Sequence, residues 1–292
     1  MNIKEVLNRS IDELRLANVS EPEGSATLLL MDVLGKDRAY LYAHGDEKLS
    51  TSDLKKFKKY IERRKSHEPV WYILGEVEFY GRKFFINNNV MTPRPETEFL
   101  VKEILFKISD FQYPISNIIE LGTGSGNIII TLFKELTNNE LQTTNYVATD
   151  ISDRALKIAR KNAKLHGVEK SIKFLHGDLL SPITNNKLRL SNTILVANLP
   201  YIPHEDMKSL QFDILHHEPR VALDGGKDGL EIYKMLIRQM KNLNFSGTAF
   251  FEIGTGQGKL ITNIVQKYFP KAKVEIKKDL ADIDRIAKIN IQ

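Results

Sequence analysis

The sequence contains no cysteine among its 292 residues. This absence excludes disulfides, thiolate zinc sites and cysteine nucleophiles, and it agrees with a protein that works in a reducing compartment. The sequence also lacks any run of about 18 apolar residues, the length that a membrane-spanning helix requires. Its first residues, MNIKEVLNRSIDELRL, carry charges throughout and have no apolar core like that of a signal peptide. We therefore expect a cytoplasmic protein with no membrane segment and no metal centre.

Low-complexity and repeated segments are also lacking. With 42% hydrophobic and 27% charged residues, the composition is that of an ordinary globular protein. The net charge of +5 favours acidic partners, but such a balance is common and decides little. The length predicts one domain of roughly 200 residues and a smaller second one.

Residues 2–66 have the apolar spacing of helices, with one stripe that contains Ile3, Val6 and Leu14. The segment SDLKKFKKYIERRK is expected to form the last of these helices, with an apolar stripe beneath a face rich in lysine and arginine. That face is either solvated or a surface for a partner.

The segment GEVEFYGRKFFINNNV alternates and holds Gly81 between two aromatic-rich runs, a pattern that predicts a β-hairpin. We expect it to join two domains. The predicted organisation is a helical, substrate-docking domain over residues 1–74, a hairpin linker over 75–98, and a catalytic domain over 99–292.

From about residue 117 the sequence repeats a pattern of strand, turn and helix. The expected strands are NIIELGT, YVATDI, IKFLHGD, TILVANL and TAFFEI, and the expected helices are SDRALKIARKNAKLHG, HEDMKSLQFDILHHE, GLEIYKMLIRQMKNL and GKLITNIVQKYF. This alternation predicts an α/β fold with a parallel sheet covered on both faces. The closing runs AKVEIKKDL and DRIAKINIQ are separated by a short turn and must pair antiparallel. A Rossmann-like, mostly parallel sheet with one antiparallel strand is typical of class I methyltransferases.

The stretch IIELGTGSGNIII places a glycine loop between a strand and a helix; its residues are Gly122, Thr123, Gly124, Ser125 and Gly126. Glycines there allow the backbone to approach a ligand closely. The dinucleotide fingerprint requires a third glycine where this chain has Asn127, which disfavours a nicotinamide cofactor. The loop suits the amino acid portion of S-adenosylmethionine better. The alternative is a tight turn without a ligand.

Polar residues follow the next strands at the same edge. Asp150 is placed to accept hydrogen bonds from ribose hydroxyls, or, alternatively, Asp150 or Ser152 caps the following helix. Asp178 could accept from an adenine amino group, and Leu179 could pack on the ring. With Asn198, these strand ends predict a cofactor crevice.

Asn198 opens the stretch Asn198-Leu199-Pro200-Tyr201 after the strand run ILVA. Its carboxamide offers one acceptor and one donor group in a plane, so it can pair with another planar group that carries an NH₂. Pro200 stiffens the backbone, Leu199 contributes shape and a carbonyl, and Tyr201 could cover the acceptor. The acceptor is then a carboxamide or an adenine; the alternative is an ordinary turn after a strand.

A second glycine loop, FEIGTGQGKLI over Phe251 to Ile261, looks like a copy of the first. Too little chain follows it to supply further ligand-binding strands, so we interpret it as a turn from a strand into a helix and not as a cofactor site.

These motifs, in their order along nearly the whole chain, resemble the PrmC/HemK family of protein-glutamine methyltransferases. The most specific are TPRPETE and EPRVALDGGKDGL, together with the glycine loop and Asn198-Leu199-Pro200-Tyr201. The resemblance implies S-adenosylmethionine as cofactor, class I peptide chain release factors as partners without a need for nucleic acid, and a catalytic site at Asn198, Pro200 and Tyr201. It also implies that Pro93, Arg94, Glu96 and Glu98 line or support the entrance. Alternatively, these four belong to a rigid linker held by ion pairs.

One departure leaves alternatives open. The family normally has Asn-Pro-Pro-Tyr, whereas this chain has Leu199, and Asn-Leu-Pro-Tyr also occurs in ribosomal RNA adenine dimethyltransferases. A nucleic-acid adenine N6-methyltransferase is therefore the second hypothesis. A non-catalytic binding module is the third, and the intact glycine loop, Asp150 and Asn198 argue against it.

Overall fold

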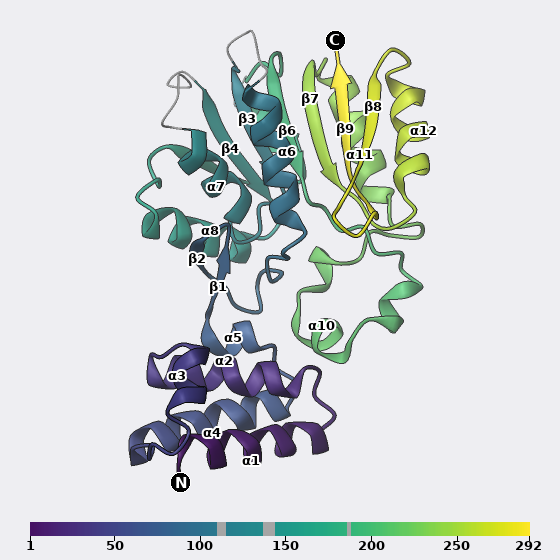
Figure 1. Ribbon diagram of the computed structural model, residues 1–292. Coiled ribbons are helices and arrows are strands. Elements are labelled where there is room, and N and C mark those ends of the chain that lie inside the picture. The colour runs from purple at the N-terminus through teal and green to yellow at the C-terminus, as the bar shows by residue number, and fades with distance from the viewer. Residues whose placement is uncertain (110–114, 137–143, 186–187) are drawn as a thin grey trace. The chain divides into compact units, whose positions relative to one another are not determined.

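The computed structural model describes residues 1–109, 115–136, 144–185 and 188–292 (Figure 1). These residues form two compact units. Unit 1 comprises Met1–Glu76 and Gln211–His217, and unit 2 comprises Val77–Leu210 and Glu218–Gln292. The hairpin expected as a separate linker therefore lies almost wholly in unit 2, and a short piece from the second half of the chain lies in unit 1.

Unit 1 is helical, as the apolar spacing predicts. Its helices are α1 (Ile3–Leu16), α2 (Pro22–Leu34), α3 (Arg38–Ala43), α4 (Thr51–Lys65), α5 (Val70–Leu74) and α10 (Phe212–His217). The side chain of Asn2 caps α1 by accepting from the backbone N–H of Glu5, and the Glu5 carboxylate accepts from the N–H of Asn2 in return. Apolar residues of α1, α2 and α4 form one core, with Leu14, Leu29, Leu30, Phe57 and Ile61 buried.

Arg64 departs from the prediction that the arginines and lysines of α4 form one exposed face. Its side chain is buried, and its Nη2 donates to Asp213 Oδ2 at 2.6 Å and to the carbonyl of Ser20 at 3.0 Å. Its Nε donates to Ser25 Oγ at 3.1 Å. The charged guanidinium group of Arg64 can be buried because each of its nitrogens donates a hydrogen bond to an acceptor. The pair attaches α10 to the helical core of unit 1.

Unit 2 is built around a seven-stranded sheet in the order β5-β4-β3-β6-β7-β9-β8. The strands are β3 (Asn117–Leu121), β4 (Asn145–Asp150), β5 (Ile172–His176), β6 (Thr193–Ala197), β7 (Gly247–Glu252), β8 (Lys273–Lys278) and β9 (Asp284–Ile291). The first five are mutually parallel, and β9 is antiparallel to both of its neighbours. The predicted class I methyltransferase sheet, with its closing hairpin, is confirmed.

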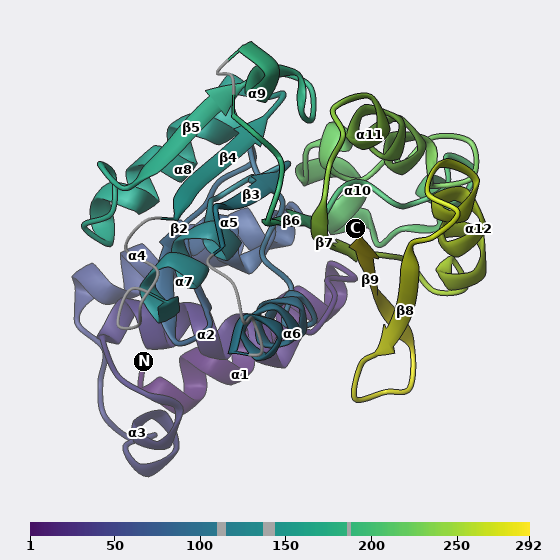
Figure 2. The same cartoon turned by 90° about the horizontal axis from the view of Figure 1, so that it is seen from above.

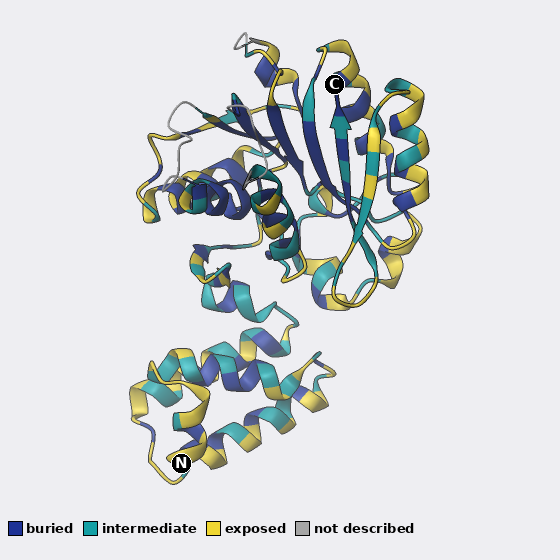
Figure 3. Ribbon diagram, turned by 45° about the horizontal axis from the view of Figure 1, so that its top comes forward, coloured by how far each residue is buried: buried dark blue, intermediate teal, exposed yellow. Residues whose placement is uncertain are grey.

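Helices cover both faces of this sheet. The helices of unit 2 are α6 (Thr97–Ser109), α7 (Asn127–Leu136), α8 (Asp153–Leu165), α9 (Ser181–Asn185), α11 (Glu231–Asn242) and α12 (Gly258–Tyr268), with single-turn 3₁₀ helices at Asp206–Ser209 and Arg220–Ala222. Figure 2 shows α6, α7 and α8 on one face and α11 and α12 on the other. The central strands are buried along their whole length, whereas the edge strand β8 is partly exposed (Figure 3). The predicted hairpin is also present, as β1 (Glu76–Phe79) and β2 (Arg82–Phe85).

The segment HEDMKSLQFDILHHE is not the single amphipathic helix that its spacing predicts. It divides into a 3₁₀ turn at Asp206–Ser209 in unit 2 and the short helix α10 in unit 1. The apolar side chains Phe212 and Leu215 remain exposed, while Asp213 is held by Arg64. A buried ion pair, which an apolar pattern does not reveal, therefore decides where this segment lies. Among the described residues, no helix is long and apolar enough to span a membrane.

Candidate active site

The register of the sheet brings the predicted strand ends together. Leu121 of β3 pairs with Thr149 of β4 on one side and with Ala197 of β6 on the other, and Ala197 pairs with Phe251 of β7. The residues that follow are Gly122, Asp150, Asn198 and Glu252, so these four lie in one row at the carboxyl edge. This edge is where ligands bind in open α/β sheets.

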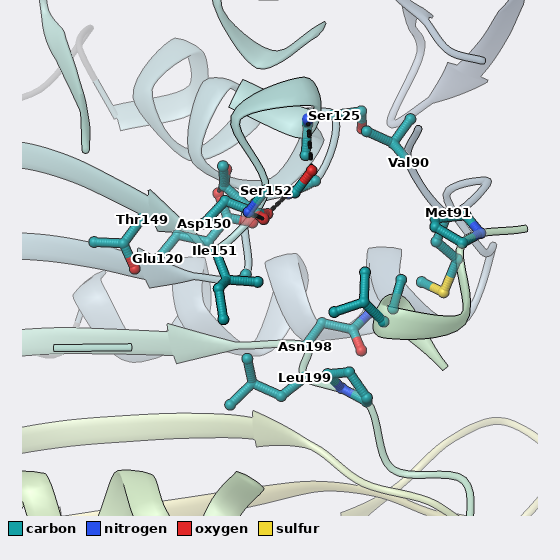
Figure 4. Close-up of a pocket in the computed structure, with 18 of the residues that line it drawn as sticks. Val90, Met91, Glu120, Ser125, Thr149, Asp150, Ile151, Ser152, Asn198 and Leu199 are labelled. Carbon is teal, nitrogen blue, oxygen red and sulfur yellow. Dashed lines mark hydrogen bonds between the residues drawn. The ribbon is translucent and has the colours of Figure 1, made fainter. Parts of the chain in front are cut away.

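A cavity of about 280 Å³ lies at this edge of unit 2. Figure 4 shows the side chains that surround it, among them Asp150, Ser152, Asn198 and Leu199. Of the predicted site residues, ten line the cavity: Gly122, Thr123, Gly124, Ser125, Asp150, Asp178, Leu179, Asn198, Leu199 and Pro200. Gly126 and Tyr201 are not among the described residues that line it.

The glycine loop has the backbone that glycine permits. Gly122, Gly124 and Gly126 all have φ between +54° and +79°. A Cβ on Gly122 would lie 2.9 Å from Leu199 Cδ2, and one on Gly126 would lie 3.3 Å from the Cβ of Ala159 in α8. A Cβ on Gly124 would meet no protein atom within 4 Å, so the space beside it belongs to the cavity. Gly122 and Gly126 therefore serve packing, and Gly124 leaves room for a ligand.

Glu120 holds this loop, a role that was not predicted. Its Oε2 accepts from Thr123 Oγ1 at 2.5 Å and from the backbone N–H of Ile129 at 3.2 Å. Burial raises the pKa of Glu120 to about 8. The residue was visible in the sequence as the acid two positions before the first glycine, but only the structure shows that it ties the loop to α7.

Asp150 faces the glycine loop from the end of β4. Its Oδ2 accepts from the N–H of Gly124 at 2.9 Å, and its Oδ1 accepts from the N–H of Ser152 at 2.8 Å. Ser152, and not Asp150, caps α8, since its Oγ accepts from the N–H of Ala155 at 3.2 Å. Burial raises the pKa of Asp150, and the two backbone bonds oppose that rise. Each carboxylate oxygen keeps a second lone pair for a ligand in the cavity.

Asp178 and Leu179 follow β5 on the far side of Asp150. Leu179 has a φ of +50° and is buried, and its carbonyl accepts from Thr149 Oγ1 at 3.0 Å. Asp178 is exposed at the cavity rim. Both residues line the cavity; their contact with an adenine ring stays a prediction.

Asn198 is half-buried at the end of β6, and its Nδ2 donates to Thr97 Oγ1 at 3.2 Å. Leu199 is buried, and its backbone N–H donates to the hydroxyl of Tyr233 at 3.3 Å. A proline at position 199 has no N–H and could not make this bond. The leucine therefore contributes a hydrogen bond that fixes the backbone beside Asn198.

Tyr201 is half-buried and packs against the core that includes residues of α11 and α12. Its hydroxyl lies 3.5 Å from Glu252 Oε1, and its carbonyl accepts from Gln257 Nε2 at 2.9 Å. Burial raises the pKa of Tyr201 to about 12, so the phenol is neutral. That Tyr201 covers the acceptor stays a prediction.

The two most specific sequence motifs contact each other. Arg94 Nη2 lies 2.6 Å from Oε1 of Glu218, whose side chain is 2% exposed. Downstream, the N–H of Ile202 donates to the carbonyl of Leu223 at 3.1 Å, and the N–H of Gly225 donates to the carbonyl of Ile202 at 2.8 Å. The segment 218–230 therefore holds the chain that follows Pro200 and Tyr201. Of the predicted entrance residues, Pro93 lines the cavity and Glu98 accepts from the N–H of Tyr80 at 2.8 Å.

Much of the cavity wall was not predicted. The additional residues come from the turn after β2 and from the start of α11 and its approach; they include Asn89, Val90, Met91, Val221, Ile232 and Met235. Val221 lies within the motif EPRVALDGGKDGL and Met91 directly precedes TPRPETE, but neither was predicted to line the cavity. Their place in the wall results from long-range packing.

The chain matches two family models. The model described as PrmC N-terminal domain matches residues 5–75, and the model described as methyltransferase domain matches residues 115–216. A release factor glutamine methyltransferase of Bacillus cereus is 37% identical over 90% of this chain and 91% of its own. A protein of the same description from Clostridium botulinum is 35% identical over 99% of both chains.

Among solved structures, a human methyltransferase 10 domain containing protein superposes with a TM-score of 0.51 at 14% identity, covering 73% of this chain and 89% of its own. That likeness shows the fold alone. The two sequence relatives cover almost the entire chain at more than 30% identity, and the matched regions contain the glycine loop, Asp150 and Asn198. The chain belongs to the PrmC/HemK family of release factor glutamine methyltransferases.

Proposed function

We propose that this protein transfers a methyl group from S-adenosylmethionine to the side-chain amide nitrogen, N5, of the glutamine in the Gly-Gly-Gln motif of class I peptide chain release factors. The observation that carries the proposal is the convergence of the glycine loop, Asp150 and Asn198 on one cavity. Release factors act on ribosomes, so the reaction belongs to the cytoplasm.

The cavity fits the cofactor at several points. The open space beside Gly124 accommodates the amino acid part, and Asp150 has lone pairs for the ribose hydroxyls. Leu179 and Ile151 offer apolar surface for the adenine. When bound, S-adenosylmethionine supplies an electrophilic methyl group on a sulfonium sulfur.

Replacing Asp150 with Ala is expected to weaken S-adenosylmethionine binding by about 1.5–3 kcal/mol, or about 10- to 150-fold, because hydrogen bonds to a charged acceptor are lost. Isothermal calorimetry measures this. Asp150→Asn is the matched variant, since its Oδ1 still accepts from Ser152 while the acceptor for Gly124 is lost. Wild-type affinity in Asp150→Ala would show that the ribose binds elsewhere.

Asn198 is proposed to orient the acceptor. Its carbonyl oxygen and the neighbouring backbone carbonyls can accept from the NH₂ of the glutamine, which draws electron density back onto an otherwise poor nucleophile. The glutamine nitrogen then attacks the methyl carbon as the C–S bond breaks, sulfur keeps the electron pair, and nitrogen loses a proton afterwards. No base is needed before transfer, so orientation is the main contribution of the protein.

The leucine at position 199 does little to distinguish a glutamine acceptor from an adenine acceptor. Its side chain is buried against Gly122, and its contribution beside Asn198 comes from the backbone.

The deciding experiment is incubation of the protein with a purified release factor, followed by mass spectrometry. We expect one added methyl on the Gly-Gly-Gln glutamine. Label from radioactive cofactor in RNA or DNA adenine, without a mass shift in the release factor, would support the nucleic-acid alternative.

We further propose that unit 1 docks the release factor. In α4, Lys55 and Lys58 are exposed beside a groove of about 320 Å³ between α1 and α4. The double variant Lys55→Glu/Lys58→Glu is expected to raise the KM for a full-length release factor about tenfold or more by charge repulsion. The KM for a short Gly-Gly-Gln peptide should not change. Lys267→Glu/Lys271→Glu, in exposed positions of unit 2, carries the same charge change and is the control; equal effects of both double variants would exclude docking on α4.

A further inference from the structure

The second glycine loop, Ile253–Gly258, connects β7 to α12 and was interpreted as a simple turn. None of its residues is among the described residues that line the cavity. Two polar residues are nevertheless buried here: Glu252, directly before the loop, is 1% exposed, and Gln257, within it, is 6% exposed. A turn that only joins a strand to a helix does not require buried polar side chains, and such groups are costly to bury.

Both side chains are directed at Tyr201. Gln257 Nε2 donates to the carbonyl of Tyr201 at 2.9 Å, and the hydroxyl of Tyr201 lies 3.5 Å from Glu252 Oε1. The loop also touches the ring, since a Cβ on Gly254 would lie 3.2 Å from Tyr201 Cδ2. The tyrosine is thus contacted at its backbone and its ring by the loop and at its hydroxyl by Glu252, the last residue of β7.

Gln257 is itself fixed. Its Oε1 accepts from the N–H of Gly254 at 2.8 Å, which closes the loop on itself. On the other side lies Gly229, where a Cβ would come within 2.6 Å of Gln257 Nε2 and 2.3 Å of the Tyr201 carbonyl oxygen. A larger residue at position 229 would displace Gln257 or Tyr201, and the two hydrogen bonds of the Gln257 carboxamide fix its orientation.

Glu252 also lies beside Asn198. The register places Glu252 next to Asn198 in the row of strand ends, and Thr97 lies between the two side chains. The hydroxyl of Thr97 accepts from Asn198 Nδ2, and it is near enough to the carboxyl of Glu252 to lower its pKa, although the pair falls short of full hydrogen-bond geometry. The backbone carbonyl of Glu252 accepts from the hydroxyl of Tyr233, which in turn accepts from the N–H of Leu199.

We propose that Glu252 and Gln257 are positioning residues that fix the segment Asn198–Tyr201, so that the carboxamide of Asn198 faces the acceptor in one orientation. Neither residue is among the described residues that line the cavity; Gln257 acts through Tyr201, and Glu252 acts through Tyr201, Thr97 and, by its backbone carbonyl, Tyr233. The expected effect of these residues on kcat rests on the proposed methyl transfer. Their expected effect on the rigidity of the segment beside the cavity does not depend on the substrate.

The experiment compares Gln257→Glu and Gln257→Met with wild type. The glutamate keeps the acceptor for Gly254 but loses the donor to the Tyr201 carbonyl, and the methionine loses both at similar length. We expect faster amide hydrogen exchange at Leu199, Tyr201 and Ile202 in both variants, and a kcat lowered about tenfold or more because orientation is lost. The affinity for S-adenosylmethionine should stay at the wild-type value. Thr255→Ala, an exposed position of the same loop, is the control and should change neither quantity.

A second pair of variants tests Glu252. Glu252→Leu removes the acceptor for the Tyr201 hydroxyl and should lower kcat, whereas Glu252→Gln retains a carbonyl oxygen there and should restore most of it. Wild-type exchange and wild-type kcat in Gln257→Glu and Glu252→Leu would overturn the proposal. If wild-type protein methylates no release factor, the proposed function fails, and the exchange rates still decide whether this loop holds the segment.

Discussion

Asn198→Ala is expected to lower the rate of methyl transfer to a release factor by about 100-fold or more, while S-adenosylmethionine binds with an affinity within about threefold of wild type. Alanine removes the groups that hold the acceptor amide, and a poorly placed acceptor nitrogen loses the advantage of a bound, aligned reactant. The glycine loop and Asp150 are unchanged, so the cofactor keeps its partners. Single-turnover kinetics together with calorimetry separates these two effects.

Asn198→Asp sharpens this experiment. Aspartate keeps the size and the acceptor oxygen but replaces the group that donates to Thr97, so the side chain is free to turn. Its rate is expected to lie between those of wild type and Asn198→Ala. Asn263→Ala, at an exposed position of α12, is the control for an asparagine outside the site. Transfer near the wild-type rate in Asn198→Ala would mean that another group orients the acceptor.

The second large effect concerns pH. Burial raises the pKa of Glu120 to about 8 and that of Glu252 to about 7, whereas in the unfolded chain both have the ordinary glutamate pKa of about 4.5. Between pH 4.5 and these raised pKa values, the two carboxyls are protonated in the folded protein and ionised in the unfolded chain. The stability from these two protonated carboxyls is therefore complete below about pH 4.5 and is lost as the pH rises through 7 and 8.

Each pKa unit corresponds to about 1.4 kcal/mol, so ionisation of each glutamate lowers the free energy of unfolding by on the order of a few kcal/mol by pH 9. Around Glu252, the nearby charge of Arg285 opposes the rise in pKa, and Glu96 and the neutral Tyr201 and Tyr233 complete its surroundings. Urea unfolding measured from pH 5 to 9 tests the expectation. Glu120→Gln and Glu252→Gln should each flatten the decline between about pH 5 and the folded pKa of the replaced residue, about 8 and about 7; curves parallel to that of wild type would show that these carboxyls are ionised in the folded state at neutral pH.

The sequence was sufficient for the features that depend on local patterns. The strands β3, β4 and β6 are short, largely apolar runs that end in, or are followed by, a polar residue or glycine, so the row that contains Gly122, Asp150 and Asn198 followed from the alternation of strands and helices. The closing hairpin followed from the short turn between its strands. These predictions needed no knowledge of how distant segments pack.

Features that depend on contacts between distant segments were not predicted. Met235 reaches the cavity from a helix without a motif, and the burial of Arg64 depends on a partner in α10. The contacts of Tyr201 could not be predicted either, because they involve Gln257 and Gly229 in two other segments. A single sequence contains these residues but not the information on which of them meet.

The ion pair between Arg64 and Asp213 has a consequence for synthesis of the chain. The two partners lie 149 positions apart, so Arg64 leaves the ribosome long before its acceptor exists. At translation rates of about 5–20 residues per second, the interval is about 7–30 s. During that time the guanidinium group must stay hydrated, since burying it unpaired would be costly. The helical unit therefore cannot reach its final form as an early, independent product of translation, and it is completed only after Asp213 has emerged.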